Sequence, residues 1–107
     1  MPEKRVLDRE RLRRVPEQFS WVDQRLVRQE YVRRCDCLGL GLYLLLVTVG
    51  DAQGLSYYSD EKAARLLSLT GGELRAARRQ LVQADLLAYA RPLYQVLALP
   101  ALPGGAS

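Results

Sequence analysis

Residues 59–99 constrain the fold more than any other stretch of this 107-residue chain. They read, in order, as a short helix, a tight turn, a second amphipathic helix and two short β-strands joined by a turn. A chain of this length is expected to form one domain. We therefore interpret the remaining residues as support for this unit and as a source of additional charge.

The first helix of the unit is expected to begin at Ser59 or Asp60, because either side chain can accept a hydrogen bond from a free backbone N–H at a helix start. The helix is short and is expected to end near Ser68. Leu69, in the following turn, should fill the corner between the two helices. The expected inner face consists of Ala63, Leu66 and Leu67.

The second helix is predicted over Glu73–Asp85, with Thr70 available as its N-cap. Apolar residues at helical spacing predict its buried side: Leu74, Ala77, Leu81 and Ala84. At about 100° per residue, the opposite side carries a different set. That set is Gly72, Arg75, Ala76, Arg79 and Gln83, with Arg78 and Gln80 on the flanks.

Two short strands follow, Ala88–Ala90 and Tyr94–Leu99, and the turn between them contains Arg91. The extended segment Leu55–Tyr58, before the first helix, is expected to add a strand to their small sheet. The predicted fold class is therefore mainly α with a small antiparallel sheet (α+β). A helix-turn-helix followed by a β-hairpin is the winged helix-turn-helix arrangement, whose second helix commonly enters DNA.

Three further elements are predicted before this unit. Cys37–Gly50 is predicted to form a helix that is apolar nearly all round and therefore buried on most sides. Phe19–Val22 predicts a short strand, whose Phe19 and Trp21 are expected to pack on the helical core. Gln24–Glu30 predicts a short helical turn. Its inward residues are expected to be Leu26 and Val27, followed by a further apolar contact from Tyr31 and Val32.

The excess of positive charge lies in the N-terminal third of the chain. Residues 1–34 contain ten Lys or Arg against six Asp or Glu, whereas residues 35–107 contain six of each. This N-terminal part is either a solvated, helix-friendly segment or a polybasic arm that adds phosphate contacts. The cations that could make those contacts are Lys4, Arg5, Arg9, Arg11, Arg13 and Arg14.

The expected organisation has three parts: a basic arm over residues 1–17, a winged-helix domain over 18–100 and a flexible tail over 101–107. Asp8 is a plausible N-cap for a short helix in the arm, which Pro16 would end.

Several chemistries are excluded by what the sequence lacks. There is no histidine, so no Ser–His or Cys–His pair can form, and no phosphate-binding glycine loop is present. We expect no enzymatic activity, no cofactor and no metal. Cys35 and Cys37 are interpreted as two partly buried structural thiols, with a redox switch or a metal shared across a dimer as alternatives. Leu38–Val49 is too short to span a bilayer, and the chain is expected to be cytoplasmic.

The predicted partners are double-stranded DNA and, in a homodimer, a second copy of the chain. Arginine can pair bidentately with guanine, and glutamine with adenine, in the major groove. The predicted contacts on the second helix are Arg75, Arg78, Arg79 and Gln83, with Arg91 in the hairpin and the arm cations on phosphates. The alternative is a module for protein–protein interaction that reuses the same fold. Its aromatic anchors would be Trp21, Tyr57, Tyr58 and Tyr89.

Residues 42–89, which read LYLLLVTVGDAQGLSYYSDEKAARLLSLTGGELRAARRQLVQADLLAY, carry a resemblance to a known group of domains. An aromatic-containing helix precedes a D-x-x-G-hydrophobic-Ser turn, an L-x-L-[ST] corner and an A-x-x-x-L-x-x-x-x-L helix. The pattern resembles winged-helix domains of plasmid and phage replication initiators and replisome-organiser proteins. It is also similar to small stand-alone bacterial winged-helix proteins. The resemblance spans roughly residues 36 to 99. It implies a DNA-binding fold that uses the exposed face of Glu73–Asp85.

Overall fold

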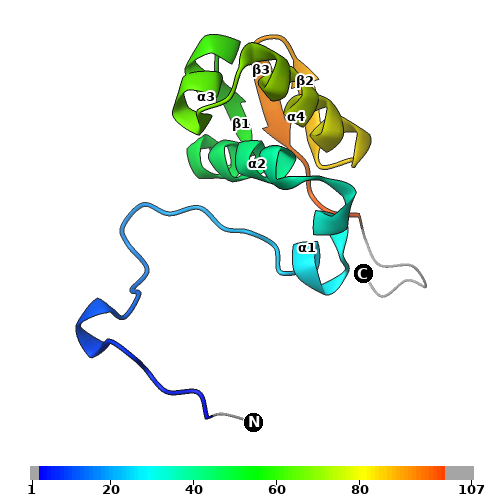
Figure 1. Ribbon diagram of the computed structural model, residues 1–107. Coiled ribbons are helices and arrows are strands. Elements are labelled where there is room, and N and C mark those ends of the chain that lie inside the picture. Colours follow the sequence, from blue (N-terminus) through cyan, green and yellow to red (C-terminus); the bar gives the residue numbers. More distant parts are fainter. Residues whose placement is uncertain (1–2, 101–107) are drawn as a thin grey trace.

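The sheet of this protein lies behind its helices, and an extended N-terminal segment leads away from both (Figure 1). The computed structural model describes residues 3–100, so the tail predicted at 101–107 lies outside the described residues. The predicted fold class is confirmed: the chain is mainly helical with a small antiparallel sheet at its C-terminal end, in a winged-helix-like arrangement. In chain order, the elements are η1 (Arg9–Arg11), α1 (Arg25–Arg28), η2 (Tyr31–Arg34), α2 (Cys37–Val49), β1 (Leu55–Tyr57), α3 (Asp60–Leu67), α4 (Gly71–Gln83), β2 (Leu87–Ala90) and β3 (Leu93–Val96).

The three strands pair in the order β1-β3-β2, and both pairings are antiparallel. The hairpin β2–β3 sets Tyr89 opposite Tyr94, while β1 sets Leu55 opposite Gln95. The extended segment before α3 therefore joins the hairpin as the sequence predicts. Arg91 lies in the turn of the hairpin, and its peptide bond to Pro92 is cis.

The core forms where α2, α4 and β3 meet. Leu42 and Leu46 of α2 are fully buried, as is Tyr94 of β3. The predicted apolar stripe of α4 is confirmed, because Leu74, Ala77, Leu81 and Ala84 are all buried. Burial of this one face fixes which side of α4 is left to solvent.

Side-chain caps fix the starts of the three longer helices. Ser59 Oγ accepts a hydrogen bond from the Lys62 N–H, so Ser59 rather than Asp60 caps α3. Thr70 and Glu73 form a reciprocal capping box at the start of α4. Both caps were available from the sequence, because each joins residues three positions apart.

The predicted strand at Phe19–Val22 is wrong. This segment belongs to none of the three strands, and Phe19 and Trp21 are exposed rather than packed on the core, at 65% and 73%. The two edges of the sheet are β1 and β2, and neither pairs with the segment. Leu26 and Tyr31 are buried on the body instead. β-propensity alone does not place a segment in a sheet, because it depends strongly on the tertiary context.

Two predictions of burial fail. Val27 is exposed although the sequence placed it beside buried Leu26, because α1 is a single turn that buries one side chain. Leu66 is exposed because α3 packs through Ala63 and Ala64. Helix α2 is buried or half-buried on most sides, as predicted, but one side of it is exposed.

Helix α2 leaves one side exposed although all of its faces are apolar. Its buried residues are Gly39, Leu42, Tyr43 and Leu46. The opposite face is exposed along Cys37, Leu44 and Thr48, with Gly41 between them. No Asp, Glu, Lys or Arg occurs between Cys37 and Val49. An uncharged helix face is thus open to solvent.

The N-terminal segment departs from the body (Figure 1). The helix predicted in the arm is reduced to the single turn η1, where the Asp8 side chain accepts from the Glu10 N–H. The radius of gyration is 16.1 Å, against roughly 13 Å for a compact chain of this length. Within residues 3–100, no helix combines the length and the apolar character needed to cross a membrane.

Candidate nucleic-acid interface

The solvent-facing side of α4 presents the side chains that the sequence predicted for it. Arg75, Arg79 and Gln83 are exposed, and they lie at successive four-residue intervals opposite the buried stripe. Residues four apart on a helix are neighbours on its surface. The structure therefore brings two guanidinium groups and one amide together along one helix face.

Arg75 lies over the first turn of α4. A Cβ atom added at Gly71 would come within 3.2 Å of Arg75 Nη1, so a side chain there would crowd the guanidinium. A Cβ atom at Gly72 would approach no closer than 3.9 Å to the atoms around it. Gly71 thus leaves the space that the Arg75 side chain occupies.

Arg78 has a different role from its neighbours on the helix. Its Nη1 donates to Asp60 Oδ1 at 2.7 Å and to the Tyr94 hydroxyl oxygen at 2.9 Å. Its guanidinium also lies 4.2 Å from the centre of the Tyr89 ring, and the side chain is 14% exposed. The sequence grouped Arg78 with the DNA-contacting residues, but the structure places its guanidinium inside the fold. There it joins α4 to α3 and to both strands of the hairpin.

The charges in this cluster stabilise one another. The hydrogen bond from Arg78 holds the pKa of Asp60 below its ordinary value. Burial opposes the charged form of Arg78, but the hydrogen bonds to Asp60 and Tyr94 outweigh burial, and the pKa of Arg78 lies above its ordinary value. Burial raises the pKa of the Tyr94 hydroxyl. Asp60 and Arg78 therefore remain an ion pair at neutral pH.

The stability contributed by Asp60 is expected to disappear in acid. Because its pKa is lowered in the folded state, the contribution is fully present above the unfolded value of about 3.9 and is lost as the pH falls through the folded value. Asp60→Asn should therefore lower the free energy of unfolding at pH 7, and its difference from the wild-type protein should shrink below about pH 4. Urea unfolding of both proteins from pH 7 to pH 2 measures this difference. A difference that is constant with pH would contradict the role assigned to the carboxylate.

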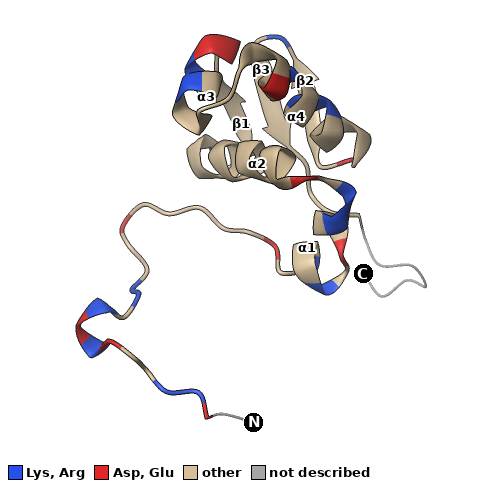
Figure 2. Cartoon of the chain, in the orientation of Figure 1, with Lys and Arg blue, Asp and Glu red and all other residues tan. Residues whose placement is uncertain are grey.

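Arg91 extends the positive surface to the hairpin turn, where it is exposed. Arg75 and Arg91 both contribute to the lowered pKa of Asp60, so both guanidinium groups lie near that carboxylate. Residues 59–96 contain six Lys or Arg and four Asp or Glu. Figure 2 shows these charges on α3, α4 and the hairpin. The helix-turn-helix and hairpin thus carry a net charge of +2, while the anions Asp36 and Asp51 lie outside this unit.

The arm cations do not lie on the same face. The six predicted residues, Lys4, Arg5, Arg9, Arg11, Arg13 and Arg14, are all exposed in the segment that leaves the body. In Figure 2 the uncharged helix α2 lies between this segment and the α4–hairpin unit. The structure therefore presents two separate basic regions, the α4 face and the arm.

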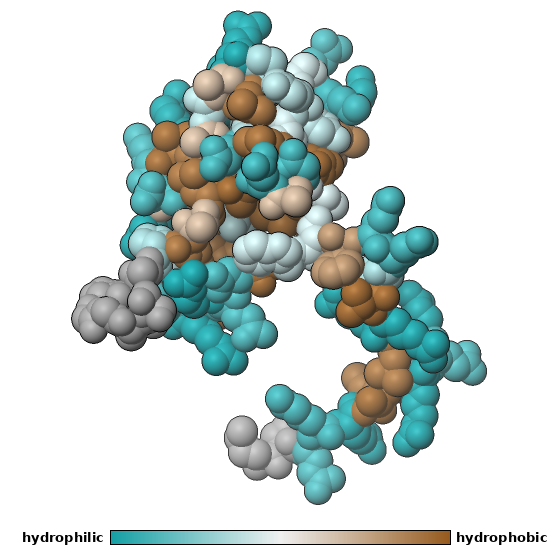
Figure 3. All heavy atoms as spheres, turned by 180° about the vertical axis from the view of Figure 1, so that it is seen from behind, coloured by the Kyte–Doolittle hydropathy of each residue, from teal (hydrophilic) through white to brown (hydrophobic). Residues whose placement is uncertain are grey.

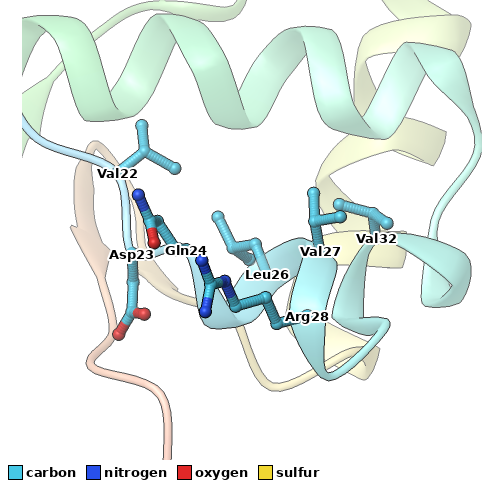
Figure 4. Close-up of a pocket in the computed structure, with 7 residues that line it drawn as sticks. All are labelled: Val22, Asp23, Gln24, Leu26, Val27, Arg28 and Val32. Atoms are coloured by element: carbon cyan, nitrogen blue, oxygen red, sulfur yellow. The ribbon is translucent and has the colours of Figure 1, made fainter. Parts of the chain in front are cut away.

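A second surface feature, missed from the sequence, is an apolar groove of about 460 Å³ beneath α2. Val22, Leu26, Val27 and Val32 project toward that helix (Figure 4). Its remaining lining residues are Asp23, Gln24 and Arg28, and Asp23 pairs with Arg25 at 2.8 Å. Most of the lining is valine and leucine, whose side chains offer no hydrogen-bond donors, and the donors among the lining residues are Gln24 and Arg28.

The two cysteines differ in their surroundings. Cys35 is partly buried, as predicted, and burial raises the pKa of its thiol. Cys37 is exposed at the start of α2, so the prediction of a second partly buried thiol is wrong. Among residues 3–100 there is no group of three or more potential metal-binding side chains.

Comparisons of this chain with protein-family models, curated proteins and solved structures found no match. The geometry and charge of the described residues are therefore the basis for a functional proposal.

Proposed function

We propose that this protein binds duplex DNA and reads it with the exposed face of α4. The observation that carries the proposal is the row of Arg75, Arg79 and Gln83 on the second helix of a helix-turn-helix that continues into a hairpin. An α-helix fits the major groove, where arginine pairs with guanine O6 and N7 and glutamine pairs with adenine. Arg91, which is exposed in the hairpin turn and near the Asp60 carboxylate, would meet a phosphate.

The process that such binding serves is proposed from the resemblance of residues 36–99 to winged-helix domains. A small bacterial transcription regulator, or an accessory factor of replication or of a mobile element, fits that resemblance. Arg78 is left out of the contacting set, because its donors bind Asp60 and Tyr94. The arm would add contacts that depend on charge rather than on sequence.

Replacing both Arg75 and Arg79 with alanine is expected to abolish the preference for one DNA sequence. Each bidentate contact to a base is worth about 1–3 kcal/mol of discrimination, so losing both should reduce selectivity at least tenfold. The measurement is selection of a preferred duplex by the wild-type protein, followed by titration of that duplex and a scrambled one with each variant.

The matched control is the double change Arg28→Ala, Arg33→Ala, which removes the same charge from exposed positions on α1 and η2. This control should retain its selectivity. Removing residues 1–16 should weaken binding to both duplexes alike and flatten the salt dependence by about 0.9 in log–log slope per lost phosphate contact. Undiminished selectivity in the Arg75, Arg79 variant would show that α4 is not the reading helix.

A second candidate function, as a protein-interaction module, is favoured by the exposed aromatic residues. Trp21 and Tyr57 are 73% and 71% exposed and are available as anchors. The other two predicted anchors are engaged within the fold: Lys62 lies over the ring of Tyr58, and Tyr89 packs against Tyr94. If the protein fails to bind any duplex at low salt, this second function becomes the better account.

A further inference from the structure

The exposed side of α2 is a helix face without a partner in its own chain. Cys37, Gly41, Leu44 and Thr48 recur at intervals of four, three and four residues, which is the spacing of a helix–helix contact. Leu44 is 63% exposed, and Leu38 adjoins this row near the start of the helix at 38%. We name these five residues the α2 face. It points away from α4, because α4 packs on the buried side of α2.

A second set of exposed apolar residues lies near the C-terminal end of α2. The Ser20 hydroxyl donates to the carbonyl oxygen of Thr48 at 3.1 Å, which holds the exposed segment Phe19–Val22 beside α2. Phe19, Trp21 and Val22 are each more than half exposed. In Figure 3, seen from behind, apolar side chains reach the surface of the body and recur along the N-terminal segment.

The exposed apolar area is close to what a dimer interface requires. Phe19 and Trp21 expose roughly 200–350 Å² together, and Leu38, Leu44 and Val22 add roughly 100–200 Å². A standard interface covers about 800 Å² on each partner, and in homodimers about 65% of that area is apolar.

The charge of this surface favours a second copy of the same chain over other occupants. A two-fold contact sets each residue near its own copy, so like charges would oppose one another. The α2 face and Phe19–Val22 contain no Asp, Glu, Lys or Arg. Asp23, which follows Val22, is paired with Arg25, and Asp36, which precedes Cys37, accepts a hydrogen bond from the Gly39 N–H as the N-cap of α2. Nucleic acid or a charged peptide would require complementary charges that this surface does not offer.

The shape of the face permits close approach of two helices. No heavy atom lies within 4 Å of the position where a Cβ atom at Gly41 would stand, so a partner helix can cross α2 there. Helices pack at separations of about 8–10 Å that depend on the side chains at the contact. A small residue at the crossing allows the shorter separation.

We propose that the α2 face packs against the α2 face of a second copy to form a two-fold dimer, with Phe19, Trp21 and Val22 at its edge. This contact leaves the exposed side of α4 free in both copies. Two reading helices on a two-fold dimer would suit a DNA site with two half-sites. The dimer is proposed for the free protein and does not require DNA.

Sedimentation equilibrium of the full chain without DNA tests the proposal. The wild-type protein should dimerise, and Leu44→Glu should raise the dimer dissociation constant at least tenfold, because it places two carboxylates in an apolar contact. Leu66→Glu is the matched control, since Leu66 is 54% exposed on α3, outside the proposed surface. This control should dimerise as the wild-type protein does.

A wild-type protein that stays monomeric at about 100 μM, or equal effects of Leu44→Glu and Leu66→Glu, would overturn the proposal. Circular dichroism checks that both variants fold. If Leu44→Glu does not fold, a crosslinking experiment tests the contact instead. Leu44→Cys and Leu66→Cys are each made in a protein that carries Cys35→Ser and Cys37→Ser, and each variant is treated with a short bismaleimide. Crosslinked dimers should form with Leu44→Cys and not with Leu66→Cys, and the reverse result would refute the α2 contact. Neither result bears on the selectivity lost with Arg75 and Arg79, so the two proposals fail separately.

Discussion

Replacing Arg78 with alanine is expected to lower the free energy of unfolding by about 2–4 kcal/mol, because its guanidinium is held by charged and aromatic partners inside the fold. The change removes the hydrogen bonds to Asp60 and Tyr94 and the contact with the Tyr89 ring. It also leaves the buried Tyr94 side chain without the donor that its hydroxyl oxygen accepts from. Losing a partner inside the protein costs more than losing one at the surface.

Arg79→Ala is the matched control, since Arg79 is the next residue of α4 and is exposed. A change at such a surface position is expected to alter stability by less than about 0.5 kcal/mol. Urea unfolding of both variants at one protein concentration measures the two values. Equal unfolding midpoints would contradict the structural role of Arg78. The same pair should show the opposite order in DNA selectivity, because we propose that Arg79 contacts the duplex and that Arg78, held by Asp60 and Tyr94, does not.

Gly54→Ala is the second change with a large expected effect, again about 2–4 kcal/mol of lost stability. Gly54 has a φ of +79°, a region that residues with a Cβ atom rarely adopt. An added Cβ atom would stand 2.7 Å from the carbonyl oxygen of Val96, which belongs to the backbone of β3. Moving the loop to relieve this contact would break the hydrogen bond from the Val96 N–H to the Gly54 carbonyl oxygen, 2.9 Å long. The start of β1 would then lose its support from β3.

Gly72→Ala is the control, and it is expected to raise the stability of the protein rather than lower it. Gly72 lies in the first turn of α4, and a Cβ atom there would make only ordinary contacts at 3.9 Å. Alanine at a helical position that already suits it stabilises a protein by about 0.4–1 kcal/mol. Thermal unfolding of the two variants should therefore shift the midpoint in opposite directions. A neutral Gly54→Ala variant would show that the loop adapts without cost.

The helix-turn-helix and the hairpin were predictable because the signals that define them are local. Thr70 and Glu73 cap α4 from three residues apart, and the buried stripe repeats within the helix itself. Such contacts form wherever the helix forms. The exposed positions of Arg75, Arg79 and Gln83 follow from the same periodicity, since burying one face of a helix leaves the other to solvent.

The failed predictions concern side chains whose partners lie far along the chain. Arg78 and Arg79 are identical as residues, and the choice between them depends on Asp60, 18 positions away, and on Tyr94, 16 positions away. Phe19 and Trp21 have the propensity of a strand, but their segment pairs with neither edge strand of the sheet, β1 or β2. Strand propensity does not determine whether a segment pairs with a sheet, because that depends on the tertiary context.

The sequence by itself therefore determined the order of the elements from β1 to β3, the N-cap Thr70 of α4 and the solvent-facing row of α4, and it limited the cap of α3 to Ser59 or Asp60. The tertiary structure decided that Arg78 belongs to the fold, that the arm cations stand apart from α4 and that one face of α2 is uncovered. The physical reason is the distance along the chain over which each kind of interaction acts. Helical periodicity and caps act over three or four residues, whereas burial of an apolar face or pairing of a charge depends on which distant segment packs against it.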